Sequence, residues 1–341
     1  MNCTKFIPPS PNFINFYFYY SYFVLFLTLT IAPLQIYAIL TKSEKLNNLK
    51  WLILNHTIWC LAFEIFSTAT KPFFFSPLVG GYPLGLLRNG NFKTTAFASY
   101  FGLLIGAISI AALTATLRSR YLLVFSAADW YKPKYGMILH LVLFILVFVP
   151  LSVLFLPPLF MEISNIHEMA LNYDPCLENF FTEPAFFFLS SEKTKSFLII
   201  EFSLMVVVLI LAIILAIYFI FLVKTNIAAT KTKLKTSLMI SAIVQLSITI
   251  CFYLIPISAF FAIFAFQIPN TENIMIVVIC AFLTHSFLEF IVTLYFVRPY
   301  RKAVIGLFQQ LNPFKNMCRK SRKISIVSNI LVFGKSDQND L

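Results

Sequence analysis

Residues 196–223 read SFLIIEFSLMVVVLILAIILAIYFIFLV and contain one charged side chain, that of Glu201. A helix needs roughly 20 mostly apolar residues to cross the hydrocarbon core of a bilayer. On the surface of a soluble domain such a run would expose a large apolar patch to water, which soluble proteins avoid. The segment therefore predicts a membrane-spanning helix.

The composition of the whole chain agrees with this interpretation. Of its 341 residues, 59% are apolar and 12% are charged, whereas soluble proteins average roughly 25% charged residues. This balance excludes a soluble enzyme, a disordered chain and a secreted disulfide scaffold. We predict an all-α membrane protein with a bundle of seven transmembrane helices. The predicted spans are Phe16–Leu40, Trp51–Phe75, Thr95–Leu117, Tyr135–Phe160, Ser196–Val223, Thr236–Phe266 and Ile274–Val297.

The basic residues predict the orientation. With seven spans, 20 of the 26 Lys and Arg residues lie on one side, five lie on the other, and Lys71 falls within a span. Because Lys and Arg gather in cytoplasmic loops, we expect the N-terminus outside and the C-terminus in the cytosol. The net charge of +12 then reflects topology, and no nucleic-acid partner is expected. The expected parts are an extracellular segment (1–15), the bundle (16–297), an amphipathic cytosolic helix (298–312) and a basic cytosolic tail (313–341).

The amphipathic helix is expected from the spacing of apolar residues after the last span. These residues recur at helical intervals on one face, and Arg301 and Lys302 lie off that face. Further on, Cys318 is a cytosolic cysteine close to the membrane, where it is either palmitoylated or an unmodified thiol. The apolar face consists of Tyr300, Val304, Leu307, Phe308 and Leu311.

The sequence carries no recognisable catalytic or cofactor pattern. It has no Gly-rich phosphate loop, no HExxH, no CxxC and no GxSxG motif, which are the common signatures of nucleotide, zinc, redox and hydrolase sites. We therefore expect neither an enzyme nor a bound metal or cofactor.

Ionisable residues within the spans are candidate functional sites, because charge is costly inside a bilayer. Glu64 lies in the second span, either as a hydrogen-bonded tie between helices or as a polar hub that changes partners. His285 and Glu289 lie four residues apart on one face of the seventh span. They form either a local pair or part of a switch. Pro256 is expected to kink the sixth span.

The segments expected outside contain two further candidate sites. Asn2-Cys3-Thr4 is an acceptor sequence for N-glycosylation. On this topology Cys3 and Cys176 are the two cysteines outside, in an oxidising compartment. We expect a disulfide between them that holds the N-terminal segment over the loop between the fourth and fifth spans; the alternative is two free thiols.

Several short motifs, in their order and spacing, resemble those of a known family. They are APLQIY at 32–37, KWLILN at 50–55, GGYPLG at 80–85, TKTKL at 230–234 followed by Gln245, HS at 285–286 and RPYR at 298–301. Together with the seven-span layout, they resemble the nematode serpentine chemoreceptors, most closely the class H (Srh) family of the Str-type superfamily of G-protein-coupled receptors. The resemblance covers residues 3 to 310.

The resemblance implies a chemosensory receptor in the plasma membrane of a sensory neuron, and we expect it in the cilia of that neuron. It implies an apolar odorant or pheromone-like ligand from outside, in a cavity lined by Phe, Tyr, Ser and Thr between the third, fifth, sixth and seventh spans. It also implies a heterotrimeric G protein as the cytosolic partner. The residues expected to face that partner are Arg118, Arg120, Lys231, Lys233 and Arg301.

The chain also departs from rhodopsin-like receptors. The end of the third span reads LRSRY at 117–121, with no acid before Arg118, and the seventh span has no NPxxY motif. Two alternatives stay open, and the missing acid before Arg118 bears on the second of them. One is a small-solute transporter or channel, and the other is a receptor-like membrane protein that does not couple to a G protein.

Overall fold

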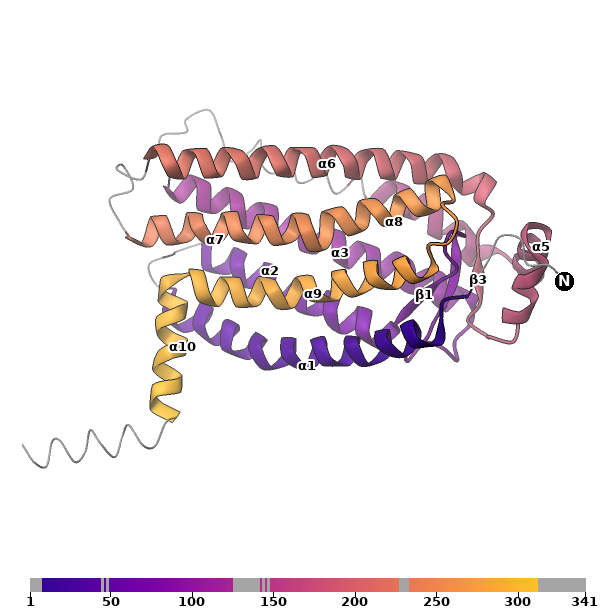
Figure 1. Cartoon of the computed structure of the whole chain (residues 1–341), viewed down its shortest axis with the longest axis horizontal. Coiled ribbons are helices and arrows are strands. Elements are labelled where there is room, and N and C mark those ends of the chain that lie inside the picture. Colours follow the sequence, from indigo (N-terminus) through magenta and orange to yellow (C-terminus); the bar gives the residue numbers. More distant parts are fainter. Residues whose placement is uncertain are drawn as a thin grey trace, which may run out of the picture.

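The computed structural model describes residues 8–43, 46, 49–124, 142, 145, 148–226 and 233–311. In this part of the chain long helices run side by side, and a small sheet covers one end of the bundle (Figure 1). The predicted all-α fold class is confirmed. The long helices are α1 (Pro11–Lys42), α2 (Leu49–Thr70), α3 (Phe92–Val124), α6 (Ser191–Asn226), α7 (Lys233–Thr249), α8 (Ile255–Phe266) and α9 (Glu272–Phe296).

These helices match the apolar runs of the sequence. Six stretches of the described residues are helical, long and apolar enough to cross a membrane, with α7 and α8 together forming one of them. Apolar side chains point outward from the bundle, for example Ile217 and Phe221 of α6, which are 62% and 60% exposed. Such exposure suits contact with lipid, because lipid tails are as apolar as these side chains.

The ends of two predicted spans need correction. The second span was predicted to continue to Phe75, but α2 ends at Thr70 and Pro72 begins a strand. In the fourth span the helix ends at Phe155 instead of Phe160, and Pro157 starts a short 3₁₀ helix, η2 (Pro157–Phe160). Proline has no N–H to donate and disfavours helical geometry in the residue before it, which explains both early ends.

A three-stranded antiparallel sheet, which the sequence analysis missed, forms from the chain after α2 and the chain just before α6 (Ser191–Asn226). Its strands are β1 (Pro72–Phe74), β2 (Gly80–Pro83) and β3 (Phe187–Phe188), in the order β1-β2-β3. In the register, Phe73 faces Tyr82 and Gly81 faces Phe187. We call this the sheet end of the bundle. Beyond it lie α5 (Ile163–Tyr173) and a second 3₁₀ helix, η3 (Pro175–Phe180) (Figure 1).

A final helix, α10 (Arg298–Leu311), lies at the opposite end of the bundle and turns away from α9 (Figure 1). Tyr300 anchors it, because this side chain is fully buried and its hydroxyl lies 2.7 Å from Ser43 Oγ at the end of α1. Phe308, further along the helix, is 61% exposed. We call this the α10 end of the bundle.

The sixth span is interrupted where Pro256 was expected to kink it. Between α7 and α8 the chain forms one π-helical turn, η4 (Ile250–Leu254), and Pro256 is the second residue of α8. Because proline cannot donate the usual backbone hydrogen bond, the wider turn accommodates the missing bond. Figure 1 shows α8 running at an angle to α7.

Gly81 provides a direct test of the sheet. A Cβ atom at this position would lie 1.9 Å from the Phe73 carbonyl oxygen of β1, so Gly81→Ala must push the strands apart. We expect this variant to lower the free energy of unfolding by about 1–3 kcal/mol. Thermal or denaturant unfolding of the purified chain measures the change.

Gly306→Ala is the matched control. A Cβ atom at Gly306 would meet nothing within 4 Å, and the residue lies in α10. Alanine favours helix over glycine by about 1 kcal/mol, so this variant should be neutral or slightly stabilising. Equal stability of the two variants would contradict the close approach of β1 and β2.

Candidate functional site

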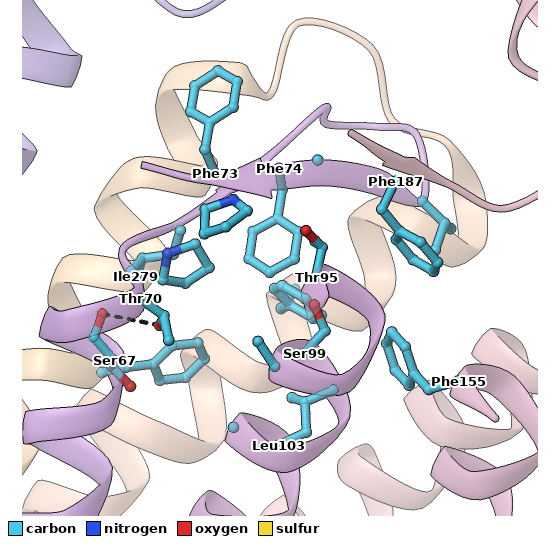
Figure 2. A pocket seen from close by; sticks show the side chains of 18 of the residues that line it. Ser67, Thr70, Phe73, Phe74, Thr95, Ser99, Leu103, Phe155, Phe187 and Ile279 are labelled. Carbon is cyan, nitrogen blue, oxygen red and sulfur yellow. Dashed lines mark hydrogen bonds between the residues drawn. The ribbon is translucent and has the colours of Figure 1, made fainter. Parts of the chain in front are cut away.

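A cavity of about 130 Å³ lies beneath the sheet, between α2, α3, α8 and α9. Side chains alternate along a strand, and Figure 2 shows the Phe74 and Phe73 rings on opposite faces of β1, with Phe74 toward the helices. Both residues border the cavity. The Phe74 ring lies 5.2 Å from that of Phe260 and 6.0 Å from that of Phe264. The sheet is therefore packed onto α8 and forms the roof of the cavity.

The lining of the cavity is aromatic, aliphatic and uncharged. As expected from the sequence, Phe and Tyr dominate, and Ser and Thr provide the polar groups. None of the described residues that line it is charged. The aromatic lining residues are Phe63, Phe66, Phe73, Phe74, Tyr82, Phe155, Phe187, Tyr253, Phe260, Phe261, Phe264 and Phe282.

The position of the cavity differs from the expectation. It was expected between the third, fifth, sixth and seventh spans, but the second span, α2, takes the place of the fifth. From α6, which is the fifth span, Leu198 is the one lining residue in the described part of the chain. The reason is that α8 packs against α6 and separates most of it from the cavity.

A lid of α5, η3 and the chain around β3 covers the sheet. Arg88, which lies between β2 and α3, donates two hydrogen bonds to the carboxylate of Glu183 in the lid. The donor–acceptor distances are 3.0 and 2.6 Å. These contacts raise the pKa of Arg88. Inside, Thr95 Oγ1 of α3 donates to the Ala185 carbonyl oxygen (2.6 Å). Cys176 of η3 is disulfide-bonded.

His167 of α5 belongs to the packing of the lid. Its ring stacks on that of Phe181, with centroids 3.9 Å apart and planes 5° from parallel. Its Nε2 atom is buried and has no hydrogen-bond partner among the described residues. Burial lowers the pKa of His167, so the neutral imidazole is the form that fits here.

A group of buried polar side chains lies deeper in the bundle, and we call it the polar core: Arg120, Ser241, Gln245, Thr249, His285, Glu289 and Thr293. The structure brings His285 and Glu289 together as expected, with 3.8 Å between His285 Nε2 and Glu289 Oε1. Thr249 of α7 joins them, because its hydroxyl lies 3.3 Å from His285 Nε2 and 3.2 Å from Glu289 Oε1. The pair therefore links α9 to α7.

Arg120 of α3 is the cation of the polar core. Its guanidinium donates to Ser241 Oγ (3.1 Å) and to Gln245 Oε1, and Gln245 Nε2 in turn donates to Thr293 Oγ1 (2.8 Å). Arg120 is fully buried. In this conformation it does not face a cytosolic partner, contrary to the expectation, because α7 presents Ser241 and Gln245 to it.

Tyr253 connects the cavity with the polar core, a role that the sequence analysis did not assign. It lies in the π-helical turn and lines the cavity. Its ring centroid is 5.5 Å from that of His285 and 5.4 Å from that of Phe282. The sequence feature that could have indicated this role is the position of Tyr253, an aromatic residue three positions before the proline at 256.

Glu64 lies between helices but has no polar partner. It is fully buried in α2, and neither carboxylate oxygen has a hydrogen-bond partner among the described residues. Tyr17 and Thr28 of α1 and Thr68 of α2 also have buried hydroxyls without a described partner. The expected hydrogen-bonded tie is therefore not formed by described side chains.

The other predicted sites are spread along the chain. Arg301 of α10 lies 5.6 Å from the Tyr295 ring, Arg118 is half-buried in α3, and Lys233 is the first residue of α7. The remaining predicted residues, Asn2, Cys3, Lys231 and Cys318, lie outside the described residues.

Comparison with known protein families gives a match over most of the chain. Residues 12–310 match the family described as serpentine type 7TM GPCR chemoreceptor Srh. No curated protein matches the chain. The match covers every helix described above except the first residue of α1 and the last of α10.

The polar core predicts a large effect at Gln245. In Gln245→Leu, Arg120 loses an acceptor and Thr293 a donor, both in a buried site. Leaving such groups unpaired should lower the free energy of unfolding by about 2–3 kcal/mol. Gln309→Leu, at an exposed position of α10, should change it by less than about 0.5 kcal/mol. Thermal unfolding of both variants in detergent tests this, and equal stability would contradict the network.

The burial of His167 predicts a pH dependence of the lid. Because its pKa is lowered in the folded lid, the unfolded lid binds a proton more readily. Lid stability should be complete above the ordinary histidine pKa of about 6.5 and should decrease as the pH falls below it. Hydrogen exchange of the α5 amides should be faster at pH 5 than at pH 7.5, after correction for intrinsic rates. His167→Phe should remove this difference; if the difference persists, another group causes it.

Proposed function

Since the chain belongs to the Srh family of serpentine seven-transmembrane G-protein-coupled chemoreceptors, we propose that it binds a small uncharged molecule from outside the cell in the cavity beneath the sheet. We further propose that it signals to a heterotrimeric G protein from the plasma membrane of a sensory neuron, including its cilia. In this proposal the sheet end faces outward and the α10 end faces the cytosol, as the distribution of Lys and Arg predicts.

The observation that carries the proposal is the contact of Tyr253 with both the cavity and His285 of the polar core. A ligand that fills the cavity must pack against the Tyr253 ring. The residue lies in a π-helical turn, and such turns occur frequently at functional sites. A shift of this ring changes the packing around His285, and so the environment of Glu289 and Thr249.

The contacts continue from there to Arg120. Thr249 and Gln245 lie one turn apart on α7, and the Gln245 side chain accepts a hydrogen bond from Arg120. Arg120 Nε and Nη2 are buried without a described partner, so its present site leaves part of the cation unsatisfied. We propose that ligand binding favours a second arrangement in which Arg120 leaves Gln245 and contacts the G protein. A ligand produces this shift only by binding the second arrangement more tightly.

The size and polarity of the cavity support a small uncharged ligand. An engineered cavity of about 150 Å³ lined by Leu, Ile and Phe binds benzene, and this cavity of about 130 Å³ is similar in size. An ionised ligand would be unfavourable in it, because none of the described lining residues carries a compensating charge.

At the α10 end, the residues that we propose to contact the G protein are Arg118, Lys231, Lys233 and Arg301.

The proposed function can be tested by nucleotide exchange. The purified chain is placed in lipid nanodiscs with a heterotrimeric G protein, and a library of small uncharged volatile compounds is screened for compounds that accelerate exchange. Ala98→Phe places a ring in the cavity from α3 and should reduce the response about tenfold or more. Val207→Phe adds similar bulk at an exposed position of α6 and should leave it unchanged.

Tyr253→Leu tests the proposed route of the signal. The loss of the ring should weaken binding of an active compound, so the comparison is made at saturating compound, where this variant should still accelerate exchange at least about fivefold less than the wild-type chain. Binding without any exchange in the wild-type chain would favour a receptor that does not couple. Flux of a solute into liposomes containing the chain, blocked by Ala98→Phe, would favour a transporter.

A further inference from the structure

Gly106 of α3 lies directly against the end of the Tyr253 side chain. A Cβ atom at this position would lie 2.5 Å from the Tyr253 hydroxyl oxygen, and the next nearest atoms belong to the Phe63 ring, at 3.3 and 3.6 Å. Non-bonded carbon atoms pack at roughly 3.5–4.0 Å, so the contact with the hydroxyl oxygen is the severe overlap. Tyr253 can therefore occupy its position because residue 106 has no side chain.

The atom that limits Gly106 belongs to the end of a side chain, which distinguishes this glycine from Gly81. At Gly81 the atom in the way is the backbone carbonyl oxygen of Phe73, which the paired strands hold in place. The Tyr253 ring can turn about its side-chain torsions, and it borders the cavity, which offers space beside it. An added methyl group at position 106 should therefore displace the Tyr253 ring and leave the helices where they are.

Displacement of this ring away from α3 changes its contacts with α9. The centroid of the Tyr253 ring lies 5.4 Å from that of Phe282 and 5.5 Å from that of His285, both on α9. Aromatic pairs at such distances have preferred relative orientations. Since His285 belongs to the polar core, the position of the Tyr253 hydroxyl against Gly106 determines how this core is packed on the side of the cavity.

We propose that Gly106 is a positioning residue, whose missing side chain allows Tyr253 to take the arrangement in which Arg120 remains in the polar core. The proposal rests on the proposed function, because it concerns the regulation of the same site. In the second arrangement of that function the Tyr253 ring has moved, so a methyl group at position 106 disfavours the described arrangement more than the second. A change that disfavours one of two arrangements shifts the population to the other. Gly106→Ala should therefore raise signalling without a ligand.

Basal nucleotide exchange measures this role. The full wild-type chain and the Gly106→Ala chain are each placed in lipid nanodiscs with a heterotrimeric G protein, and exchange is followed with no compound added. Thermal unfolding establishes that both chains are folded at the assay temperature. Gly106→Ala should raise the basal rate about threefold or more, which ordinary overpacking is sufficient to produce. A purely structural defect would lower this rate instead, because less of the chain would be folded.

The same substitution in a Tyr253→Phe chain is the matched control. Phenylalanine keeps the ring and lacks the oxygen atom that an alanine at position 106 would meet, and the remaining near atoms are those of Phe63. The effect of alanine on the helix itself is the same in both chains, so the comparison isolates the contact with the hydroxyl. In the Tyr253→Phe chain, Gly106→Ala should change the basal rate less than about twofold.

The outcomes separate this role from the proposed function. If the wild-type chain responds to a compound but Gly106→Ala has the wild-type basal rate, the positioning role is wrong and the proposed function stands. An increase that persists in the Tyr253→Phe chain would also overturn the role, since another contact would then cause it. If no compound accelerates exchange by the wild-type chain and Gly106→Ala has no effect, the proposed function is wrong and this inference falls with it.

A second variant is available if Gly106→Ala alone does not fold. Phe282→Leu makes room beside the Tyr253 ring, because the two rings are in contact. Gly106→Ala is then introduced into the Phe282→Leu chain and compared with Phe282→Leu alone. The same increase in the basal rate is expected, and an unchanged rate would contradict the positioning role.

Discussion

Backbone polar groups within a bilayer must find their hydrogen-bond partners inside the protein. A proline interrupts the hydrogen bonds of a helix, so beyond it the backbone needs other partners. Pro72 and Pro157 each follow the end of a helix at the sheet end of the bundle. Beyond α2, β1 pairs with β2, and β2 pairs with β3. This sheet satisfies backbone groups that a longer α2 would have satisfied itself. It also places Phe74 over the space between α2, α3 and α8, so the cavity is a consequence of where the helices stop.

The same reasoning applies to the sixth span. Pro256 removes one backbone hydrogen bond, and the π-helical turn before it changes the direction of the side chains that follow. As a result Tyr253 faces the cavity and contacts His285. One local irregularity thus joins an apolar cavity at the sheet end to the polar core that contains Arg120. The wider turn shifts the side chains that follow it relative to those of a regular helix with its period of 3.6 residues.

Much of the bundle could be predicted from sequence because a span is a local property. Long apolar runs located the helices, although α3 continues to Val124, beyond the predicted end at Leu117. The i, i+4 spacing of His285 and Glu289 placed both on one buried face. The sheet could not be predicted in this way, because β2 pairs with β3 more than 100 residues away. The burial of Arg120 was missed for a related reason. It depends on Ser241 and Gln245 of another helix, and a single sequence does not state which faces of two helices meet.

The cavity and the polar core differ in what their burial costs. The cavity can remain uncharged and partly empty, because a dry apolar cavity is stable without a ligand. The polar core contains a buried cation with two nitrogens that lack a described partner, and burying a charge without full compensation is unfavourable. In the proposed mechanism, ligand binding completes the packing at the cavity, and the incomplete bonding of Arg120 lowers the cost of its leaving the polar core. Within the described residues, the Arg120 guanidinium bonds to two side chains, those of Ser241 and Gln245, so the proposed change would have to break few hydrogen bonds.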